Sequence, residues 1–315
     1  MTYPMKKIEK FLQRIAALTL LTSIACIMPA IAQDKPVEKL DEPTEKSEKQ
    51  LARPAFESAM LIDVQSVIVP SKGTLEFDIQ HRFGSIENGI SDFYGIYAPG
   101  ANIRLGFTYS PIENLSLGFG YAKLKSYLDF TAKYSILKQT KDWGMPVSIT
   151  YYGNMAIDTR QAEDYEFDKG VHRLSFQNEL IIAVRINSKL SLQITPSYSH
   201  FNAVDSVINN EDNTKGVFSN DIIGLAIYGR YKFSHQSSIV FGTAQQLTGH
   251  DDLPGFDLQP SYSLGWEIST SSHAFQIFIT NFQGIIPQEN MVYNQNDFFA
   301  GDLIIGFNIT RLWSF

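Results

Sequence analysis

Apolar and polar residues alternate along the last fifteen residues of the chain. From Leu303 every second position is apolar or bulky, and small or polar side chains occupy most positions between. A repeat of two is the side-chain period of a β-strand. The first series consists of Leu303, Ile305, Phe307, Ile309, Arg311, Trp313 and Phe315. The pattern therefore predicts a long final strand that carries two aromatic residues, Trp313 and Phe315, at its end.

The same alternation recurs from Thr74 onward, with turn-forming residues between the repeats, and it predicts twelve strands. They lie near residues 74–83, 101–110, 115–123, 127–138, 146–157, 171–186, 190–201, 220–233, 238–247, 260–270, 274–281 and 302–315. Connections after even strands are brief, whereas those after odd strands are long, except near Leu124. An even number of strands with short turns at one end and long loops at the other is typical of a bacterial outer-membrane barrel.

The alternation shows which side chains of each strand should face lipid, the apolar set, and which should face the barrel interior, the polar set. Ile103, Leu105, Phe107 and Tyr109, for example, alternate with Arg104, Gly106, Thr108 and Ser110. A water-soluble β-sandwich is the alternative, but such a fold gives no reason for short connections after even strands and long connections after odd strands. A sheet in hydrocarbon must close, because no edge can stay unpaired. We therefore predict an all-β fold, a transmembrane antiparallel up-and-down β-barrel of about 12 strands with a disordered N-terminal tether.

The N-terminus has the three parts of a secretory signal. Basic residues precede an apolar run from Ile15 to Pro29, and Ala30-Ile31-Ala32 offers a cleavage site. We predict that residues 1–32 are a signal peptide. A lipoprotein signal ending at Cys26 is the alternative, but the residues after this cysteine stay apolar. Cys26 is the only cysteine, so its removal would leave a mature chain without disulfides.

Residues 33–54 form a charged run with hardly any apolar residue, and we predict a disordered periplasmic linker there. It is either a plain linker or a site for a periplasmic partner such as peptidoglycan. Phe56 to Val69 is more apolar and could be a plug, a short helix or a lead-in to the barrel. We place the barrel domain as a whole at residues 55–315. The net charge of −7 excludes nucleic acid as a partner, since no strongly basic stretch accompanies it. The aromatic content of 13% suits the interfacial girdles of a barrel.

Several short fragments carry a resemblance to a known family. They are Phe56-Glu57-Ser58, Gln65-Ser66, His81-Arg82-Phe83-Gly84, Asn102-Ile103-Arg104-Leu105-Gly106, Met145-Pro146-Val147-Ser148, Gly229-Arg230-Tyr231-Lys232, Gly301-Asp302 and Gly306-Phe307-Asn308-Ile309. Over about residues 55 to 315 the chain resembles the β-barrel family called domain of unknown function 5777. The resemblance implies a secreted or outer-membrane barrel and assigns no catalytic residue. The terminal aromatics Trp313 and Phe315 are similar to the signal that the barrel-assembly machinery reads during insertion.

Charged residues occur on the polar phase, which we expect to line the lumen. They are Glu76, Asp78, Asp129, Glu179, Glu267 and Asp302 with Arg82, Arg104, Lys133, Arg173 and Arg230. If they pair across the interior, they fill a narrow barrel with ion pairs. If they segregate on opposite walls of a water-filled lumen, they make a transverse field that orients a polar solute. We favour a narrow or partly plugged passage, because a twelve-stranded barrel is intermediate between packed and open cylinders.

The loops are acidic and offer two candidate sites for a divalent cation. Asn209 to Asn213 and His250-Asp251-Asp252 carry hard oxygen ligands, although neither has EF-hand spacing. The alternative is that these residues are solvated loops that only keep the surface charged. We predict no bound metal and no cofactor.

A hydrolase would need a serine and a histidine on one face. Ser199 and His200, with Asn202 nearby, are adjacent on a strand and so point to opposite faces, and His172 and Ser175 have an odd spacing. A protease-like pair of His250 and Asp251 stays formally open. We find no Walker loop, HExxH or CxxC motif.

We therefore predict a non-enzymatic outer-membrane barrel that acts as a narrow channel for small polar solutes or ions, with a slight cation preference from its acidic loops. A closed structural barrel that binds a partner through its loops or N-terminal segment is the second hypothesis, and a hydrolase is the third. Its expected partners are outer-membrane lipid and the barrel-assembly machinery, with an N-terminus in the periplasm.

Overall fold

The computed structural model describes residues 50–161, 167–208, 215–250, 253 and 255–315. The predicted signal peptide and residues 33–49 of the predicted linker lie outside these ranges. So do the Asn209–Asn213 cation candidate and Asp251 and Asp252 of the other one.

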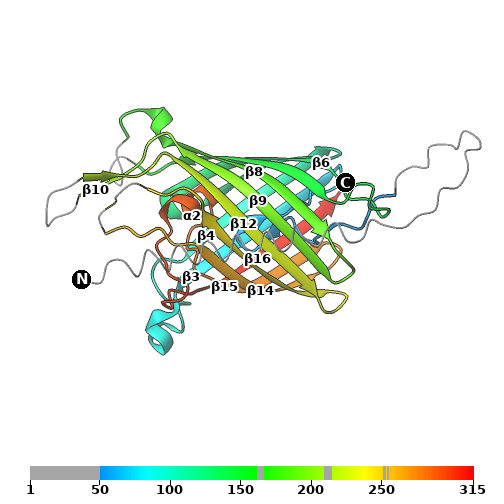
Figure 1. The fold of residues 1–315 in the computed structure, drawn as a ribbon. Helices are drawn as coiled ribbons and strands as arrows, with labels where there is room; N and C mark the ends of the chain where they lie inside the picture. Colours follow the sequence, from blue (N-terminus) through cyan, green and yellow to red (C-terminus); the bar gives the residue numbers. More distant parts are fainter. Residues whose placement is uncertain (1–49, 162–166, 209–214, 251–252, 254) are drawn as a thin grey trace, which may run out of the picture. The chain divides into compact units, whose positions relative to one another are not determined.

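Twelve antiparallel strands form one closed barrel, which confirms the predicted fold (Figure 1). They are β3 (Thr74–Ser85), β4 (Asn102–Ile112), β5 (Leu115–Ala122), β6 (Tyr127–Leu137), β7 (Ser148–Asp158), β8 (Leu174–Arg185), β9 (Leu190–Phe201), β12 (Asp221–Lys232), β13 (Ser237–Gln246), β14 (Ser261–Ser269), β15 (His273–Thr280) and β16 (Ile304–Ser314). Each strand pairs with its neighbours in sequence, and β16 closes the cylinder against β3, from Ile304 opposite Ser85 to Ser314 opposite Thr74. The predicted final strand is therefore the closing strand.

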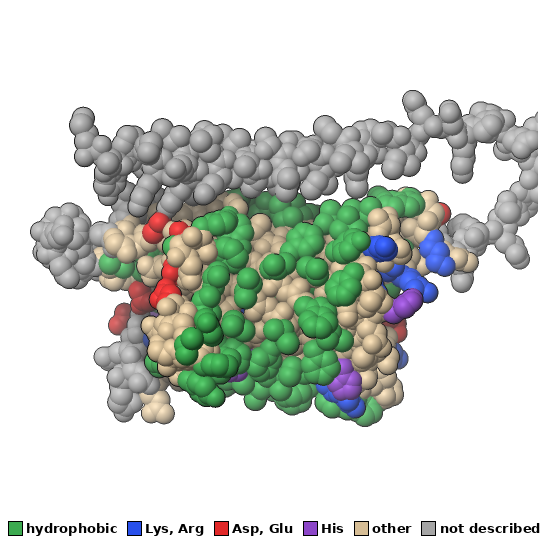
Figure 2. Space-filling model, turned by 90° about the horizontal axis from the view of Figure 1, so that it is seen from below, with side chains coloured by type: hydrophobic (Ala, Val, Ile, Leu, Met, Phe, Trp, Pro, Cys, Tyr) green, Lys and Arg blue, Asp and Glu red, His purple; other side chains and the backbone are tan. Residues whose placement is uncertain are grey.

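The two faces of the sheet are inverted relative to a soluble protein. Apolar side chains of the outward phase are exposed, among them Leu105, Phe119 and Trp266, at 46–52% of their surface. The inward phase is buried and polar, as the alternating burial along β3 and β8 shows. Figure 2 shows hydrophobic side chains covering the middle of the visible barrel wall, with acidic side chains at one end and basic ones at the other. Such an apolar outer band is the surface that a bilayer covers.

The connections differ between the two ends of the barrel. The turns after β4, β8, β12 and β14 are short, and the C-terminus lies at their end, on the right in Figure 1. The long loops follow β3, β7, β9, β13 and β15 at the opposite end, which we call the loop end. They contain the 3₁₀ helices η2 (Ile86–Asp92) and η4 (Gly170–Arg173), the hairpin β10 (Ser206–Ile208) with β11 (Lys215–Val217), and the helix α2 (Pro287–Tyr293); the shorter η3 (Leu124–Ser126) joins β5 to β6. Among the described residues, no helix is long and apolar enough to cross a bilayer.

Two segments fill the lumen from opposite ends. Residues 55–69, which we call the plug, enter from the short-turn end, where Leu51 bridges to Thr140 and Ala52 N donates to Gln139 O at 2.8 Å. The plug contains the two-residue strands β1 (Met60–Leu61) and β2 (Val64–Gln65), which form a hairpin of their own. At the other end α2 turns inward, and all its residues from Gln288 to Val292 are buried. Phe56 to Val69 could have been a plug, a short helix or a lead-in to the barrel, and the structure shows that it is a plug.

Candidate functional site

The wall of the barrel holds the plug chiefly by its main chain. Side chains from six strands donate hydrogen bonds to six plug carbonyls, so the plug backbone is held along most of its length. The bonds run from Arg230 to Ala55 O (3.0 Å), Lys133 to Ala59 O (2.9 Å), Gln276 to Met60 O (3.0 Å), Asn308 to Ile62 O (2.9 Å), Gln193 to Gln65 O (2.7 Å) and Thr150 to Val67 O (2.8 Å). Burying these carbonyls is tolerated because each has a donor.

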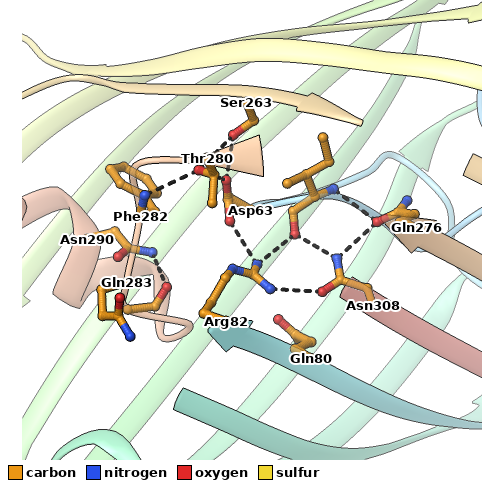
Figure 3. A network of polar contacts seen from close by, with 12 residues as sticks. Asp63, Gln80, Arg82, Ser263, Gln276, Thr280, Phe282, Gln283, Asn290 and Asn308 are labelled. Atoms are coloured by element: carbon orange, nitrogen blue, oxygen red, sulfur yellow. Dashed lines mark hydrogen bonds and ion pairs between the residues drawn. The ribbon is translucent and has the colours of Figure 1, made fainter. Parts of the chain in front are cut away.

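Asp63 at the tip of the plug hairpin makes the strongest single attachment. Its Oδ1 accepts from Arg82 Nη2 at 2.8 Å, and both side chains are almost completely buried. Its Oδ2 accepts from Ser263 Oγ at 2.5 Å and from Thr280 Oγ1 at 2.7 Å (Figure 3). Three wall residues, Arg82, Ser263 and Thr280, thus meet at one carboxylate of the plug. Charge-assisted bonds of this kind are the strong ones, so we call Asp63 the latch residue.

The turn that presents Asp63 is strained. Ile62 has φ +57°, a left-handed conformation that is unfavourable for a β-branched residue. This geometry aims the two polar groups of its backbone at the wall. Ile62 N donates to Gln276 Oε1 at 3.2 Å, and Ile62 O accepts from Arg82 and Asn308. The surrounding contacts therefore hold a conformation that the free peptide would leave.

Apolar packing supplies the second kind of attachment. Phe56, Leu61 and Ile62 of the plug are nearly fully buried, and they belong to one apolar cluster with residues of the wall. The wall members of this cluster include Ile181, Ala226, Tyr228, Val240, Ala244 and Phe278. These wall members lie on β8, β12, β13 and β15, whereas most charged side chains of the inner wall lie on β3, β4, β6 and β8.

Near the short-turn end, Arg230 and Lys232 hold the start of the plug. Arg230 Nη1 lies 3.7 Å from Glu267 Oε1 and 3.6 Å from Glu57 Oε1, and Lys232 Nζ lies 2.6 Å from Glu57 Oε1. Partial burial acts to raise the pKa of Glu57, but the hydrogen bond from Lys232 and the charge of Arg230 prevail and lower it. Glu57 is therefore ionised, and its charge binds the plug to Arg230 and Lys232 at the short-turn end.

On the charged wall, Arg104 of β4 joins Asp78 of β3 to Asp129 of β6, across the intervening strand β5. It makes a bidentate pair with Asp129, with both bonds at 2.8 Å, and its Nη1 lies 2.9 Å from Asp78 Oδ1. The guanidinium lies flat over Gly120, where a Cβ atom would come within 2.5 Å of Arg104 Cζ. A glycine at this inward position is thus required for the ion pairs above it.

A small cavity of about 50 Å³ separates the plug from this wall. Glu76, Asp129, Lys133 and Glu179 line it together with residues of the plug, and Ile285 to Pro287 close it towards the loop end. Lys133 also donates to Gln65 Oε1 at 3.1 Å, whereas Glu179 Oε2 is buried without a hydrogen-bond partner. The volume is enough for a few water molecules and for no larger solute.

The helix α2 closes the lumen from the loop end. Gln288 Nε2 donates to Asn154 Oδ1 at 2.9 Å, and Glu289 accepts from Tyr127 at 2.8 Å and from Lys125 at 2.9 Å. Sequence reasoning assigned residues 282–301 to a loop and missed this helix. The signal was present, because Pro287 occupies the first turn, where proline is favoured.

The expected lumen charges therefore fall into three groups. Glu76, Asp78, Arg104, Asp129, Lys133 and Glu179 surround the cavity. Arg82 and Arg230 bond to the plug, and Glu267 lies beside Arg230 and accepts from Gln276. Arg173 and Asp302 lie outside the barrel strands, at the loop end. Arg173 ends η4 and donates to Asp158 O and Arg160 O, and Asp302 accepts from Asp297 N at 2.7 Å. Among the four expected arginines, only Arg230 pairs with an expected glutamate, Glu267, while Arg82 pairs with Asp63 of the plug.

The histidines considered for catalysis have other contacts. His200 lies on the outward phase of β9 and contacts Asp221 at 2.7 Å, whereas Ser199 points inward and donates to Gln177. His250 accepts from Ser219 N at 2.9 Å through Nδ1 and contacts Val292 O at 2.7 Å through Nε2. His250 thus joins its loop to Ser219 through Nδ1 and to α2 through Nε2, and burial lowers its pKa. Within the described ranges, no group of three or more ligand side chains could hold a metal ion.

Comparisons with known proteins give one matching family and several similar solved structures. A family model described as a membrane-bound β-barrel domain, domain of unknown function 5777, matches residues 56–313. Similar solved structures include a NanC porin (10% identity, 76% of this chain and 99% of that chain, TM-score 0.47) and an outer-membrane channel from Pseudomonas putida F1 (11% identity, 78% and 97%, TM-score 0.49). No curated protein matches the sequence. The matched residues begin in the plug and end in the closing strand.

Proposed function

The chain belongs to the membrane-bound β-barrel family called domain of unknown function 5777, and from this premise we propose that it is a plugged channel of the outer membrane for small polar solutes or ions. At rest the plug and α2 close the lumen. Conduction requires that the plug leave its site and that α2, which shares the apolar cluster with the plug through Met291 and Val292, move away with it.

The observation that carries this proposal is the way in which the plug is bound. Its attachments to the charged wall are hydrogen bonds and ion pairs, whose wall partners can be solvated by water once the plug has left. A net hydrogen bond contributes only about 0.5–1.5 kcal/mol, because water replaces the lost partner. A displaced plug would therefore leave behind a hydrated, charged surface over β3 to β8 that suits small polar solutes.

The charges around the cavity support a cation preference. Glu76, Asp78, Asp129 and Glu179 face it, against Arg104 and Lys133. Acidic side chains also gather at the loop end in the view of Figure 2. Charges of one sign along a narrow, low-dielectric passage raise the local concentration of the opposite ion.

A closed scaffold barrel is the second candidate function, and the apolar cluster favours it. Phe56, Leu61 and Ile62 bury apolar surface against the wall, and this stabilises the closed state more than polar contacts alone would. In this case the loops or the N-terminal segment would bind a partner while the lumen stays shut.

Conductance in planar bilayers separates the two functions. Full-length protein is expected to stay mostly closed, and a variant that lacks residues 33–69 is expected to show discrete current steps with a cation-biased reversal potential. Heat-modifiable migration on SDS gels confirms that the variant forms a barrel. A folded variant that never conducts would establish the scaffold and end the channel proposal.

A further inference from the structure

The loop between β3 and β4, residues 86–101, displays apolar side chains to the outside. Its helix η2 buries none of its residues. Ile90 and Tyr97 are both 80% exposed. Phe93, Tyr94 and Ile96 are exposed as well. A contiguous apolar patch of this kind on an ordered segment marks a contact surface.

The loop is built to keep these side chains outside. Phe93 and Tyr94 both adopt left-handed backbone conformations, with φ +53° and +56°, which non-glycine residues rarely take. The Asp92 carboxylate accepts from Gly95 N at 2.9 Å, and Gly95 O accepts from Gly84 N at 2.9 Å. These bonds fasten the loop to the end of β3, so the strained turn persists and presents two aromatic rings.

The patch continues the lipid-facing band of the barrel. The outward series of β3 ends at Phe83, whose ring packs against His81 and Phe307. Ile86 N donates to Leu303 O at 2.9 Å and so joins the loop to the β15–β16 connection. Phe299 of the same connection is exposed, and its ring meets the ring of Tyr262 edge to face, with the ring centroids 5.0 Å apart. The loop end of the band thus carries an aromatic rim that includes the patch.

The direction of the loop identifies what it meets. In Figure 1 the loop, drawn in cyan, projects sideways from the barrel wall rather than along the barrel axis. When the apolar band of the barrel is embedded, this direction runs along the membrane surface. An apolar segment there lies at the depth of the headgroups, where aromatic side chains are enriched.

The charges of the loop are consistent with an apolar mode of binding. Residues 84–103 contain no lysine or arginine. The carboxyl group of Glu87 shares a hydrogen bond with Asp302, which raises its pKa, and that of Asp92 is bonded to Gly95. We propose that the loop of residues 86–101 inserts Ile90, Phe93, Tyr94 and Tyr97 between the headgroups and acyl chains of the leaflet at the loop end. Its insertion does not depend on attraction to anionic lipid.

Site-specific fluorescence in vesicles tests this anchor. Ile90→Cys and Tyr97→Cys are introduced into the chain without residues 1–32, which removes the native cysteine, and an environment-sensitive dye is attached. Gly249→Cys in the β13–β14 loop is the control, since a side chain there meets open space. The dye at positions 90 and 97 is expected to be quenched by lipids brominated on the acyl chain, to be shielded from iodide relative to position 249, and to keep both properties in high salt.

Two outcomes would overturn the proposal. Equal iodide access at positions 90, 97 and 249 would place the loop in water. Disulfide cross-linking between Tyr97→Cys residues of two copies, with no bromine quenching, would show that a second copy covers the patch. Because Ile90 and Tyr97 are largely exposed, an Ile90→Ser, Tyr97→Ser variant is expected to form the barrel normally, which separates a folding defect from a lost anchor.

Discussion

Neutralising Asp63 is expected to open the barrel. In the Asp63→Asn variant the side chain keeps its size, but the charge that compensates buried Arg82 is lost. Removing one partner of a buried ion pair typically costs about 3–5 kcal/mol, because the other charge stays buried without compensation. Each 1.4 kcal/mol is a factor of about ten in an equilibrium constant, so the ratio of closed to open barrels should fall by a factor of about 100 to 4,000.

Single-channel recording measures this ratio directly as the open probability. Wild type, Asp63→Asn and Arg82→Gln are compared at the same voltage, with Lys189→Gln at an exposed short turn as the control. Both lumen variants should conduct far more often than wild type, and the control should match wild type. The paired replacement Asp63→Leu with Arg82→Met removes both charges and should restore closure in large part, because buried pairs can be exchanged for apolar residues at little cost. If Asp63→Asn is folded and stays as closed as wild type, the latch reasoning is wrong.

Three further predictions follow from the structure. Gly120→Ala should disrupt the ion pairs of Arg104 and lower the stability by about 1–3 kcal/mol in urea titrations, whereas Gly170→Ala, at a glycine with open space around it, should not. Phe315→Ala should reduce the amount of assembled barrel in cells but leave the stability of refolded protein nearly unchanged, because this side chain is 87% exposed; equal losses in both assays would contradict a role as an insertion signal. Lowering the pH from 7.5 to 5 should loosen α2, which would be seen as faster amide exchange. Burial lowers the pKa of His250 below 6.5, so the stabilisation by neutral His250 is complete above pH 6.5 and is lost as the pH falls through the lowered pKa. The His250→Gln variant should lack this pH dependence.

The barrel could be predicted from the sequence because lipid and lumen impose opposite demands on alternate residues. Every predicted strand coincides with an observed one, and the errors are at strand ends. Arg173 and Asp302 were assigned to strands on the alternation alone, but β8 begins at Leu174 and β16 at Ile304. The alternation of apolar and polar residues continues beyond the strand at Arg173 and at Asp302. These two side chains bond to backbone groups at the loop end instead of facing the lumen.

The interior of the barrel was much less predictable. Alternation tells which side chains face inward, but their partners depend on what fills the lumen. Arg82 bonds to a plug residue 19 positions earlier, and Glu289 bonds to Tyr127 at a separation of 162 positions. Neither spacing has a local signature, because both pairs depend on the diameter of the cylinder and on the depth at which each segment enters. The plug was one of three forms considered, and α2 was missed for the same reason.

The position of the plug also constrains how the molecule is made. The segment that fills the lumen precedes β3, and the cylinder is sealed only when β16, the last strand to be synthesised, reaches β3. A sheet that seals first would have to admit the plug afterwards through a narrow opening. Residues 55–69 meet less obstruction if they bind the inner face of the sheet before β16 pairs with β3. Folding of the plug and closure of the barrel would then be one coupled step, whereas later exit of the plug would be the opening of the finished channel.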